Sequence, residues 1–392
     1  MYRECSFLRS HIRSILDFYL PRAIDRRAGG FFGGLTDDGT IYDPDTRHLV
    51  DTCRHIYNYS TAIVLFGEDR FAEAAEHGLK FLDTAHRLPQ GGFAWVLENR
   101  RIEDATRHCY GHAFVLLAAS AAAKAGLSEA AALVDETWKI LEERFFEPEA
   151  GLYADQIGPS SWSDVDSYRG QNANMHLCEA MLVAYEATGD SRFLDRAETL
   201  ARRICLELAA ETDGLVWEHY RRDWSVDWDY NREDPKNLFR PYGYLPGHFV
   251  EWTKLLVLLH RSRPEGWMLD RARALFDAAL EHGWDSERGG FNYTFAPDGR
   301  ILDTDRYYWV LSEAIAAAAL LGRALGVEAV WQWYDRFWEY SGNVLIDHKH
   351  GGWYRVTDPD GKPYDELKSP PAKTDYHPLS ACAASLLALQ PD

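Results

Sequence analysis

The chain has 392 residues, of which 46% are hydrophobic and 26% charged, a balance typical of a globular protein with a sizeable core. Its formal net charge of −19 argues against nucleic acid or anionic membranes as partners, because binding either one requires a basic surface. The first residues mix arginine, glutamate and histidine with apolar side chains, and no long apolar run follows, so neither a signal peptide nor a membrane span is expected.

A glycine followed by an apolar or aromatic residue recurs six times along the chain, each time opening a short β-prone stretch. Successive copies are roughly 60 residues apart, with one interval of roughly 76 that contains a polar, aromatic insert at 221–240. Turn dipeptides such as Asp38-Gly39 predict hairpin-like loops at these places. The copies begin at Gly30, Gly92, Gly151, Gly214, Gly290 and Gly352.

Between these loops the apolar spacing predicts two helices for each repeat. In chain order the twelve helices are expected at 4–20, 49–66, 70–85, 107–124, 128–144, 171–188, 191–208, 247–261, 266–282, 307–325, 328–342 and 375–388.

The two helices of each pair differ in charge. One is amphipathic, as in SRFLDRAETLARRICLEL, and the other is poor in charge on every side, as in YGHAFVLLAASAAA. A helix that is apolar all round is buried all round. The pattern therefore predicts an all-α fold, an (α/α)6 barrel of twelve helices with short β-hairpin loops at one end. We expect residues 1–392 to form a single catalytic domain.

Polar residues cluster in the first turns of the predicted inner helices. Because these helices all run in the same direction, their N-termini should meet at one end of the barrel. Burying so many polar groups without a use would cost several kcal/mol, which favours a functional site. The residues are Arg54, His55, Tyr110, His112, Asn172, His176, His248, Glu251, Trp309, Glu313 and His377.

Two His-x-x-Glu pairs, His176 with Glu179 and His248 with Glu251, place a carboxylate one turn beyond an imidazole on the same helix face. A carboxylate in that place can fix the tautomer of the histidine and raise its basicity. The third histidine, His377, has no such partner three residues on. A further feature is Arg54, a permanent cation suited to stabilise an oxyanion on a substrate.

No metal or cofactor is expected. The histidines and glutamates come from separate helices without the H-E-x-x-H spacing of a zinc site, and no phosphate-binding glycine loop follows a strand. Six scattered cysteines without a C-x-x-C pair read as reduced thiols, which places the protein in the cytoplasm. The many aromatic residues in the loops fit a carbohydrate ligand, although bracing of the loops explains each of them equally well.

With these features the chain resembles the N-acylglucosamine 2-epimerase superfamily over essentially its whole length, and most closely its branch of D-mannose and sulfoquinovose isomerases. The stretches that carry the resemblance are CRHIYNYS (53–60), YGHAFVLLAA (110–119), YRGQNANMHLCEAM (168–181), EHYRRDWSVDWDYNREDP (218–235), YGYLPGHFVEWTKLL (242–256), DRYYWVLSEAIAAA (305–318) and KTDYHPL (373–379).

The resemblance implies a metal-free sugar isomerase that converts D-mannose to D-fructose through a cis-enediol, with D-lyxose to D-xylulose as a second conversion of the same kind. It implies His248 and His377 as acid and base, with Glu251 behind His248. The sugar would lie among Arg54, Tyr110, Asn172, His176 and Trp309. We assign His377 as the base for the C2 proton and His248 as the ring-opening acid or second base. The reverse assignment stays open.

Several alternatives stay open at this point. Proton delivery to the opposite face of C2 would make the protein a 2-epimerase of mannose, an N-acylhexosamine or cellobiose, and sulfoquinovose is another substrate. A glycoside hydrolase would use Glu251 with Asp305 or Glu313, and a non-catalytic sugar-binding protein is the third class. The oligomeric state, monomer or homodimer, is not set. We expect the insert 221–240 to fold over the mouth and limit the site to monosaccharides.

Overall fold

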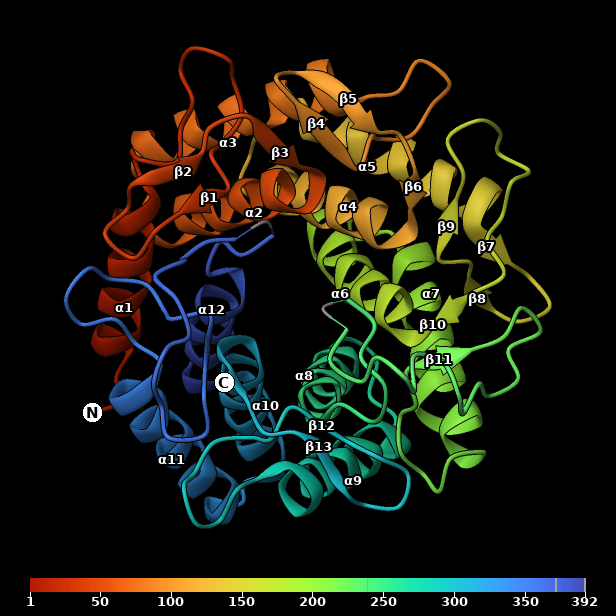
Figure 1. Ribbon diagram of the computed structural model, residues 1–392, viewed down its shortest axis with the longest axis vertical. Helices are drawn as coiled ribbons and strands as arrows, with labels where there is room; N and C mark the ends of the chain where they lie inside the picture. The colour runs from red at the N-terminus through yellow and green to blue at the C-terminus, as the bar shows by residue number, and fades with distance from the viewer. Residues whose placement is uncertain (238, 371, 391–392) are drawn as a thin grey trace.

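A computed structural model describes residues 1–237, 239–370 and 372–390. Within these ranges twelve α-helices are arranged in a ring, as the sequence predicts (Figure 1). They are α1 (Cys5–Tyr19), α2 (Leu49–Phe66), α3 (Asp69–Phe81), α4 (Cys109–Lys124), α5 (Ala130–Ile140), α6 (Gln171–Thr188), α7 (Ser191–Arg202), α8 (Pro246–Ser262), α9 (Gly266–Gly283), α10 (Tyr308–Leu325), α11 (Glu328–Val344) and α12 (Tyr376–Leu389).

The even-numbered helices form the inner ring. Each of them packs against the next, and α12 packs against α2, which closes the circle. The odd-numbered helices cover them from outside, with α1 on α12. This agrees with the charge pattern, because α4 and α10 are buried on nearly every side whereas α7 buries one stripe. The predicted (α/α)6 barrel is confirmed.

Most helix bounds lie within one or two residues of the prediction. Three outer helices differ, because the last turn of each is a π-helix rather than an α-helix. These turns are η1 (Leu82–His86) after α3, η2 (Leu141–Phe145) after α5 and η3 (Arg203–Leu208) after α7. At the start of α7 the side chain of Asp190 accepts a hydrogen bond from the backbone N–H of Arg192, an N-cap.

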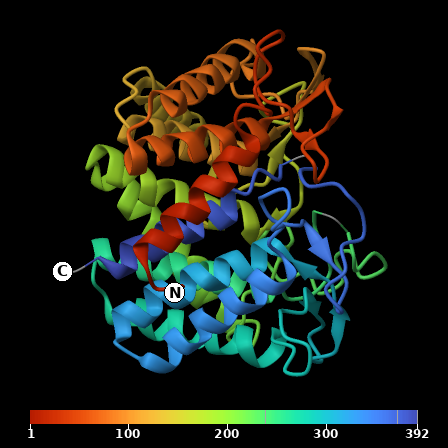
Figure 2. The same ribbon diagram turned by 90° about the vertical axis from the view of Figure 1, so that its left-hand side faces the viewer.

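Short strands and long loops gather at one end of the ring (Figure 2). The strands are β1 (Gly34–Leu35), β2 (Ile41–Asp43), β3 (Thr46–His48), β4 (Val96–Glu98), β5 (Arg101–Asp104), β6 (Arg107–His108), β7 (Phe146–Glu147), β8 (Leu152–Tyr153), β9 (Gln156–Ile157), β10 (Arg169–Gly170), β11 (His219–Tyr220), β12 (Thr294–Phe295), β13 (Ile301–Asp303), β14 (Arg306–Tyr307) and β15 (Val356–Thr357).

Four of these strands lead directly into an inner helix: β3 into α2, β6 into α4, β10 into α6 and β14 into α10. Each pairs with a strand in the loop of the next repeat, as in the antiparallel pair β14–β15, where Arg306 lies opposite Thr357. These pairs tie neighbouring repeats together at the rim. They also fix where the first turn of each inner helix begins.

Buried arginines stand at equivalent places in three repeats, in the strand just before an inner helix. Each forms an ion pair with an acidic residue in the loop after the preceding outer helix. Breaking such a buried pair from one side leaves an uncompensated charge, which is strongly destabilising. The pairs are Arg47 with Asp25 (2.7 Å), Arg169 with Glu147 (2.6 Å) and Arg306 with Asp285 (2.6 Å).

The repeated glycines adopt a backbone conformation that other residues rarely reach. Gly30 has φ of 72° and Gly290 has φ of 76°. A Cβ atom on Gly30 would lie 2.7 Å from the ring of Phe81, and one on Gly290 would lie 2.7 Å from the ring of Tyr340. The left-handed conformation, which all six repeated glycines share, explains why glycine recurs at this place in the repeat.

By length and composition α10 would be able to cross a membrane, which the sequence analysis did not anticipate. However, 78% of its apolar window is buried inside the ring. α10 is therefore a core helix of the ring, and its burial accounts for its apolar composition.

Candidate active site

The polar side chains of the inner helices lie in layers. One layer comes from the second or third residue of its helix: Tyr110, His248, Trp309 and His377. The next comes from the sixth residue: Arg54, His176, Glu251 and Glu313. Because an α-helix rises about 1.5 Å per residue, the second layer lies about one turn deeper in the barrel. The predicted convergence at one end of the ring is therefore present.

His377 is buried and held by a carboxylate. Its Nδ1 lies 2.6 Å from Oε1 of Glu313, and its Nε2 lies 3.4 Å from a guanidinium nitrogen of Arg54. The carboxylate accepts a hydrogen bond from Nδ1–H, so Nε2 carries the lone pair of the ring, and Arg54 donates to that lone pair. Burial lowers the pKa of His377 to about 4, although the hydrogen bond with Glu313 acts to raise it. The imidazole is therefore neutral at neutral pH and can take up a proton.

The guanidinium of Arg54 lies beside His377. It donates to the hydroxyl of Tyr110 at 3.1 Å and to the carbonyl of Ala372, and it stacks over the ring of Phe114. Burial acts to lower the pKa of Arg54, but the hydroxyls of nearby tyrosines raise it, so the cation persists. A fixed cation next to a neutral imidazole suits the stabilisation of an enediolate oxygen.

His248 is also held by a carboxylate, but not by the predicted one. Its Nδ1 lies 2.9 Å from Oε1 of Glu218, which precedes β11. Glu218 in turn accepts a hydrogen bond from the amide of Gln171 at 3.0 Å. The expected contact with Glu251 is wrong, because the ring of His248 turns towards the loop instead of down its own helix. Both oxygens of Glu251 lack a hydrogen-bond partner among the described residues.

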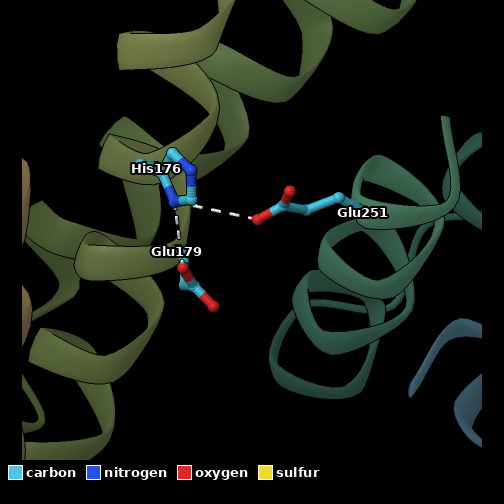
Figure 3. Close-up of side chains that lie close together, drawn as sticks. All are labelled: His176, Glu179 and Glu251. Carbon is cyan, nitrogen blue, oxygen red and sulfur yellow. Dashed lines mark hydrogen bonds and ion pairs between the residues drawn. The ribbon is translucent and has the colours of Figure 1, made fainter. Parts of the chain in front are cut away.

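The second His-x-x-Glu pair forms as predicted. The Nδ1 of His176 lies 3.3 Å from Oε2 of Glu179 and 3.7 Å from Oε1 of Glu251 (Figure 3). The ring of His176 lies 5.0 Å from that of Tyr110 and 6.5 Å from that of His377, measured between centroids. His176 of α6 and His377 of α12 therefore approach each other across the centre of the ring.

Two predicted residues remain, Trp309 and Asn172. The ring of Trp309 lies between the two histidines, 5.2 Å from His248 and 5.9 Å from His377 between centroids. Asn172 has a buried side-chain oxygen without a hydrogen-bond partner in the described part of the chain. An aromatic face and an unpaired amide oxygen are groups that a sugar ring and its hydroxyls can satisfy.

Two histidines proposed for the mouth do not reach it. His55 packs on the rings of Phe31, Tyr19 and Tyr59, between α2 and the outer helices, and His112 packs on aromatic rings of the second repeat. Adjacent residues on a helix point about 100° apart, so when Arg54 faces the centre His55 cannot. Both are buried core residues.

His55 gives a prediction about stability. Neither ring nitrogen has a hydrogen-bond partner among the described residues, and burial lowers the pKa of His55 to about 3. Between pH 6.5 and 3 the unfolded chain therefore binds more protons, and stability falls as the pH drops, by about 1.4 kcal/mol per unit for one such group. We expect His55→Phe to lose less stability than the wild type between pH 7 and pH 5, by about 2 kcal/mol in urea unfolding. Parallel pH profiles would contradict this.

Three glutamates and two histidines could in principle hold a metal ion, in the groups His176–Glu179–Glu251 and Glu251–Glu313–His377. The ammonium of Lys254, however, lies between the three carboxylates, 3.0 Å from Glu179, 2.7 Å from Glu313 and 3.8 Å from Glu251. The place of a cation is thus taken by a side chain of the protein. These residues fit an internal ion network better than a metal site.

The acid pairs considered for a glycoside hydrolase find no support. Oxygens of Glu251 and Glu313 lie within 4.8 Å and share the ammonium of Lys254, whereas hydrolytic acids flank the substrate from two sides. Asp305 accepts hydrogen bonds from Lys236 at 3.3 Å and from the hydroxyl of Tyr364 at 2.6 Å, outside the buried cluster.

The insert 221–240 lies at the mouth end of the ring, and its residue 238 is outside the described residues. The guanidinium of Arg240 lies 3.8 Å above the ring of Tyr168, which precedes α6. Further along, Lys236 pairs with Asp303 at 2.9 Å, in β13. The insert therefore reaches from the start of α6 towards the start of α10, in front of α8.

Sequence reasoning missed three residues of this cluster: Glu218, Gln171 and Lys254. Nothing in the sequence around Glu218 indicates its contact with His248, because this loop residue comes next to His248 only when the whole chain folds. For Lys254 a signal exists, since it is a single charge one turn beyond Glu251 on a helix otherwise apolar at its centre. Gln171 is the first residue of α6, a capping position whose inward direction the sequence does not reveal.

Comparison with known proteins agrees with this arrangement. A D-mannose isomerase of Marinomonas mediterranea is 47% identical over 378 residues, covering 96% of this chain and 95% of the relative. A D-mannose isomerase of Thermobifida fusca is 35% identical, with 98% and 95% covered. The crystal structure of a D-mannose isomerase superposes with a TM-score of 0.96 at 46% identity over 98% of both chains. The profile described as N-acylglucosamine 2-epimerase matches residues 30–381. The chain belongs to the N-acylglucosamine 2-epimerase family.

Proposed function

We propose that this protein is an aldose–ketose isomerase that interconverts D-mannose and D-fructose. Two relatives that are similar over nearly their whole length are D-mannose isomerases, and so is the protein whose crystal structure superposes with a TM-score of 0.96. The observation that carries the proposal is the neutral His377, backed by Glu313, with its Nε2 next to Arg54. The substrate of the protein is a free monosaccharide. Six unpaired cysteines agree with a reducing compartment, and we assign the protein to the cytoplasm.

The geometry supports a proton transfer between neighbouring carbons. After the sugar ring opens, Nε2 of His377 takes the C2 proton, and the electron pair of the C–H bond forms the C1–C2 double bond of an enediolate. Arg54 stabilises the negative charge on the oxygen. The proton then returns from His377 to C1, and the proton of the C2 hydroxyl passes to the negatively charged oxygen on C1. The oxygen on C2 thereby becomes the ketone and that on C1 a hydroxyl group, which gives fructose. Positioned acid–base groups of this kind contribute about 10²–10⁴-fold to the rate.

The second histidine has a separate role in this scheme. His248, oriented by Glu218, lies on the other side of Trp309 from His377 and donates or accepts the proton of the ring oxygen during ring opening. Its Nδ1 lies 2.9 Å from Oε1 of Glu218 and 2.9 Å from the amide nitrogen of Gln171, so this side of the ring is occupied and Nε2 is the atom left to face the substrate. The insert 221–240 narrows the mouth and favours a monosaccharide over a longer sugar.

Incubation with D-mannose in D2O containing EDTA, followed by NMR, tests the proposal. We expect fructose as the main product, with deuterium at C1 to the extent that the proton on His377 exchanges with solvent, and no loss of rate with EDTA. Glucose carrying deuterium at C2 would instead identify a 2-epimerase. Absence of any turnover of mannose, with conversion of an N-acylmannosamine or a disaccharide, would overturn the proposal.

A further inference from the structure

A fully buried lysine lies at the centre of the barrel, below the histidines. Lys254 is the ninth residue of α8 and is 2% exposed. Its ammonium lies 2.7 Å from Oε2 of Glu313 in α10 and 3.0 Å from Oε1 of Glu179 in α6. Lysine is almost never fully buried unless it is paired, so these contacts hold it in place. None of the chemistry assigned above uses this residue.

Each of these two carboxylates holds a histidine with its other oxygen. Oε1 of Glu313 lies 2.6 Å from Nδ1 of His377, and Oε2 of Glu179 lies 3.3 Å from Nδ1 of His176. Oε2 of Glu179 also accepts a hydrogen bond from the hydroxyl of Tyr376. One ammonium is therefore connected, through one carboxylate on each side, to two imidazoles in different parts of the ring.

The charges of this cluster balance. Burial acts to raise the pKa of Glu313 and of Glu179, but the ammonium and the histidine contacts lower both below their usual values, so both are ionised. Burial and the charge of Glu313 raise the pKa of Glu251 well above its usual value, so Glu251 is a neutral acid. Two carboxylates then face two cations, Lys254 and Arg54, and the histidines are uncharged. The buried set is neutral only while Lys254 is present.

We propose that Lys254 is a positioning residue, which keeps Glu313 and Glu179 as pure hydrogen-bond acceptors so that His377 and His176 present Nε2 to the sugar. This role rests on the proposed function of His377 and deepens it. Without the ammonium, Glu313 faces two other glutamates in a site that excludes water. It then takes up a proton, and a protonated carboxyl group can donate to Nδ1 of His377 and reverse its tautomer.

The titratable groups on which the ammonium acts come from four inner helices. They are Tyr57 of α2, His176, Cys178 and Glu179 of α6, Glu251 of α8 and Glu313 of α10. Tyr376 and His377 of α12 lie one contact further out, on Glu179 and Glu313. Among these the carboxyl groups respond most to loss of the ammonium, because Lys254 acts on all three of them.

The first test replaces the lysine by methionine, which has a similar length and no charge. We expect Lys254→Met to lower kcat by about 100-fold, to change KM less than threefold and to shift the acid limb of the pH–rate profile to higher pH. In ¹⁵N NMR the histidine signals that disappear in His377→Gln belong to His377. These should show the Nδ1–H tautomer in the wild type and lose it in Lys254→Met.

A second variant separates charge balance from packing. Glu179→Gln combined with Lys254→Met removes one negative and one positive charge, so Glu313 can stay ionised. We expect this double variant to be at least tenfold more active than Lys254→Met alone. Additive losses of activity would overturn the proposal, because contacts that only contribute packing do not compensate each other.

Lys368→Met is the matched control for removal of a buried lysine. Lys368 is fully buried and pairs with Asp347 at 2.6 Å and with Asp37 at 3.4 Å, neither of which is a partner of His377, His176 or His248. We expect this variant to unfold at a lower temperature but to keep the wild-type pH profile.

A Lys254→Met protein with the wild-type tautomer of His377 overturns the positioning role. A wild type that does not convert mannose contradicts the proposed function alone, because the NMR readout needs no turnover.

Discussion

Replacement of His377 by glutamine is expected to lower kcat for the conversion of mannose to fructose by about 10²–10⁴-fold, with a small change in KM. The reason is that Nε2 of His377, next to Arg54, carries the lone pair that takes up the C2 proton. The side-chain amide of glutamine is too weak a base to remove a proton from carbon. The residual reaction should show a full primary isotope effect with mannose deuterated at C2, because breaking the C–H bond becomes still slower. Steady-state rates with both substrates measure this.

His248→Gln is the matched control, since it removes an imidazole with the same kind of carboxylate partner. We expect it to slow conversion as well but to reduce the isotope effect, because ring opening then limits the rate. If instead His377→Gln reduces the isotope effect and His248→Gln shows it in full, then His248 is the base for the C2 proton and His377 acts in ring opening. Conversion by His377→Gln within a few-fold of the wild type would remove His377 from the chemistry altogether.

Replacement of Arg54 by alanine is expected to lower kcat by about 10²–10³-fold, the range found when one donor to a developing oxyanion is removed. The guanidinium carries a positive charge next to His377 and holds the hydroxyl of Tyr110 at 3.1 Å. Its loss should affect the transition state more than binding, because charge appears on the sugar oxygen only after the C2 proton leaves. Measurement of kcat and KM separately tests this.

Arg54→Lys and Tyr110→Phe refine this result. Lysine keeps the charge but cannot make the two separate contacts of a guanidinium, so we expect an intermediate loss. Tyr110→Phe keeps Arg54 and removes only one of its partners, so we expect the smallest loss of the three. A raised KM with an unchanged kcat in Arg54→Ala would show that Arg54 binds substrate and transition state equally.

Much of the fold was predictable because its strongest determinant is local. Inner helices such as α4 and α10 lack charge on every side, and the glycines at 30 and 290 mark the loops that separate the pairs. The position of a residue within its helix also follows from sequence. This is why Arg54 and His176, both in the first two turns of their helices, were expected at the same end of the barrel.

The partners across the barrel were not predictable in the same way. His248 and Glu251 are three residues apart on one helix, yet the imidazole turns to Glu218 in a loop. For His377 no partner was predicted, and its Nδ1 forms a hydrogen bond with Glu313 of a different helix. Which of several carboxylates a histidine meets depends on how the helices are rotated, and that is set by packing of the whole ring.

Closure of the ring by α1 and α12 has a consequence for the order in which the protein is made. The first helix packs against the twelfth, and Figure 2 shows the two side by side. The apolar residues Leu8, Ile12 and Leu16 of α1 are therefore not covered by α12 until some 370 further residues have been synthesised. At ordinary rates of synthesis this takes tens of seconds. Since α12 also carries His377, a nascent chain can build most of its helices and still be inactive. The synthesis of α12 therefore completes the active site and covers the apolar face of α1 at the same time.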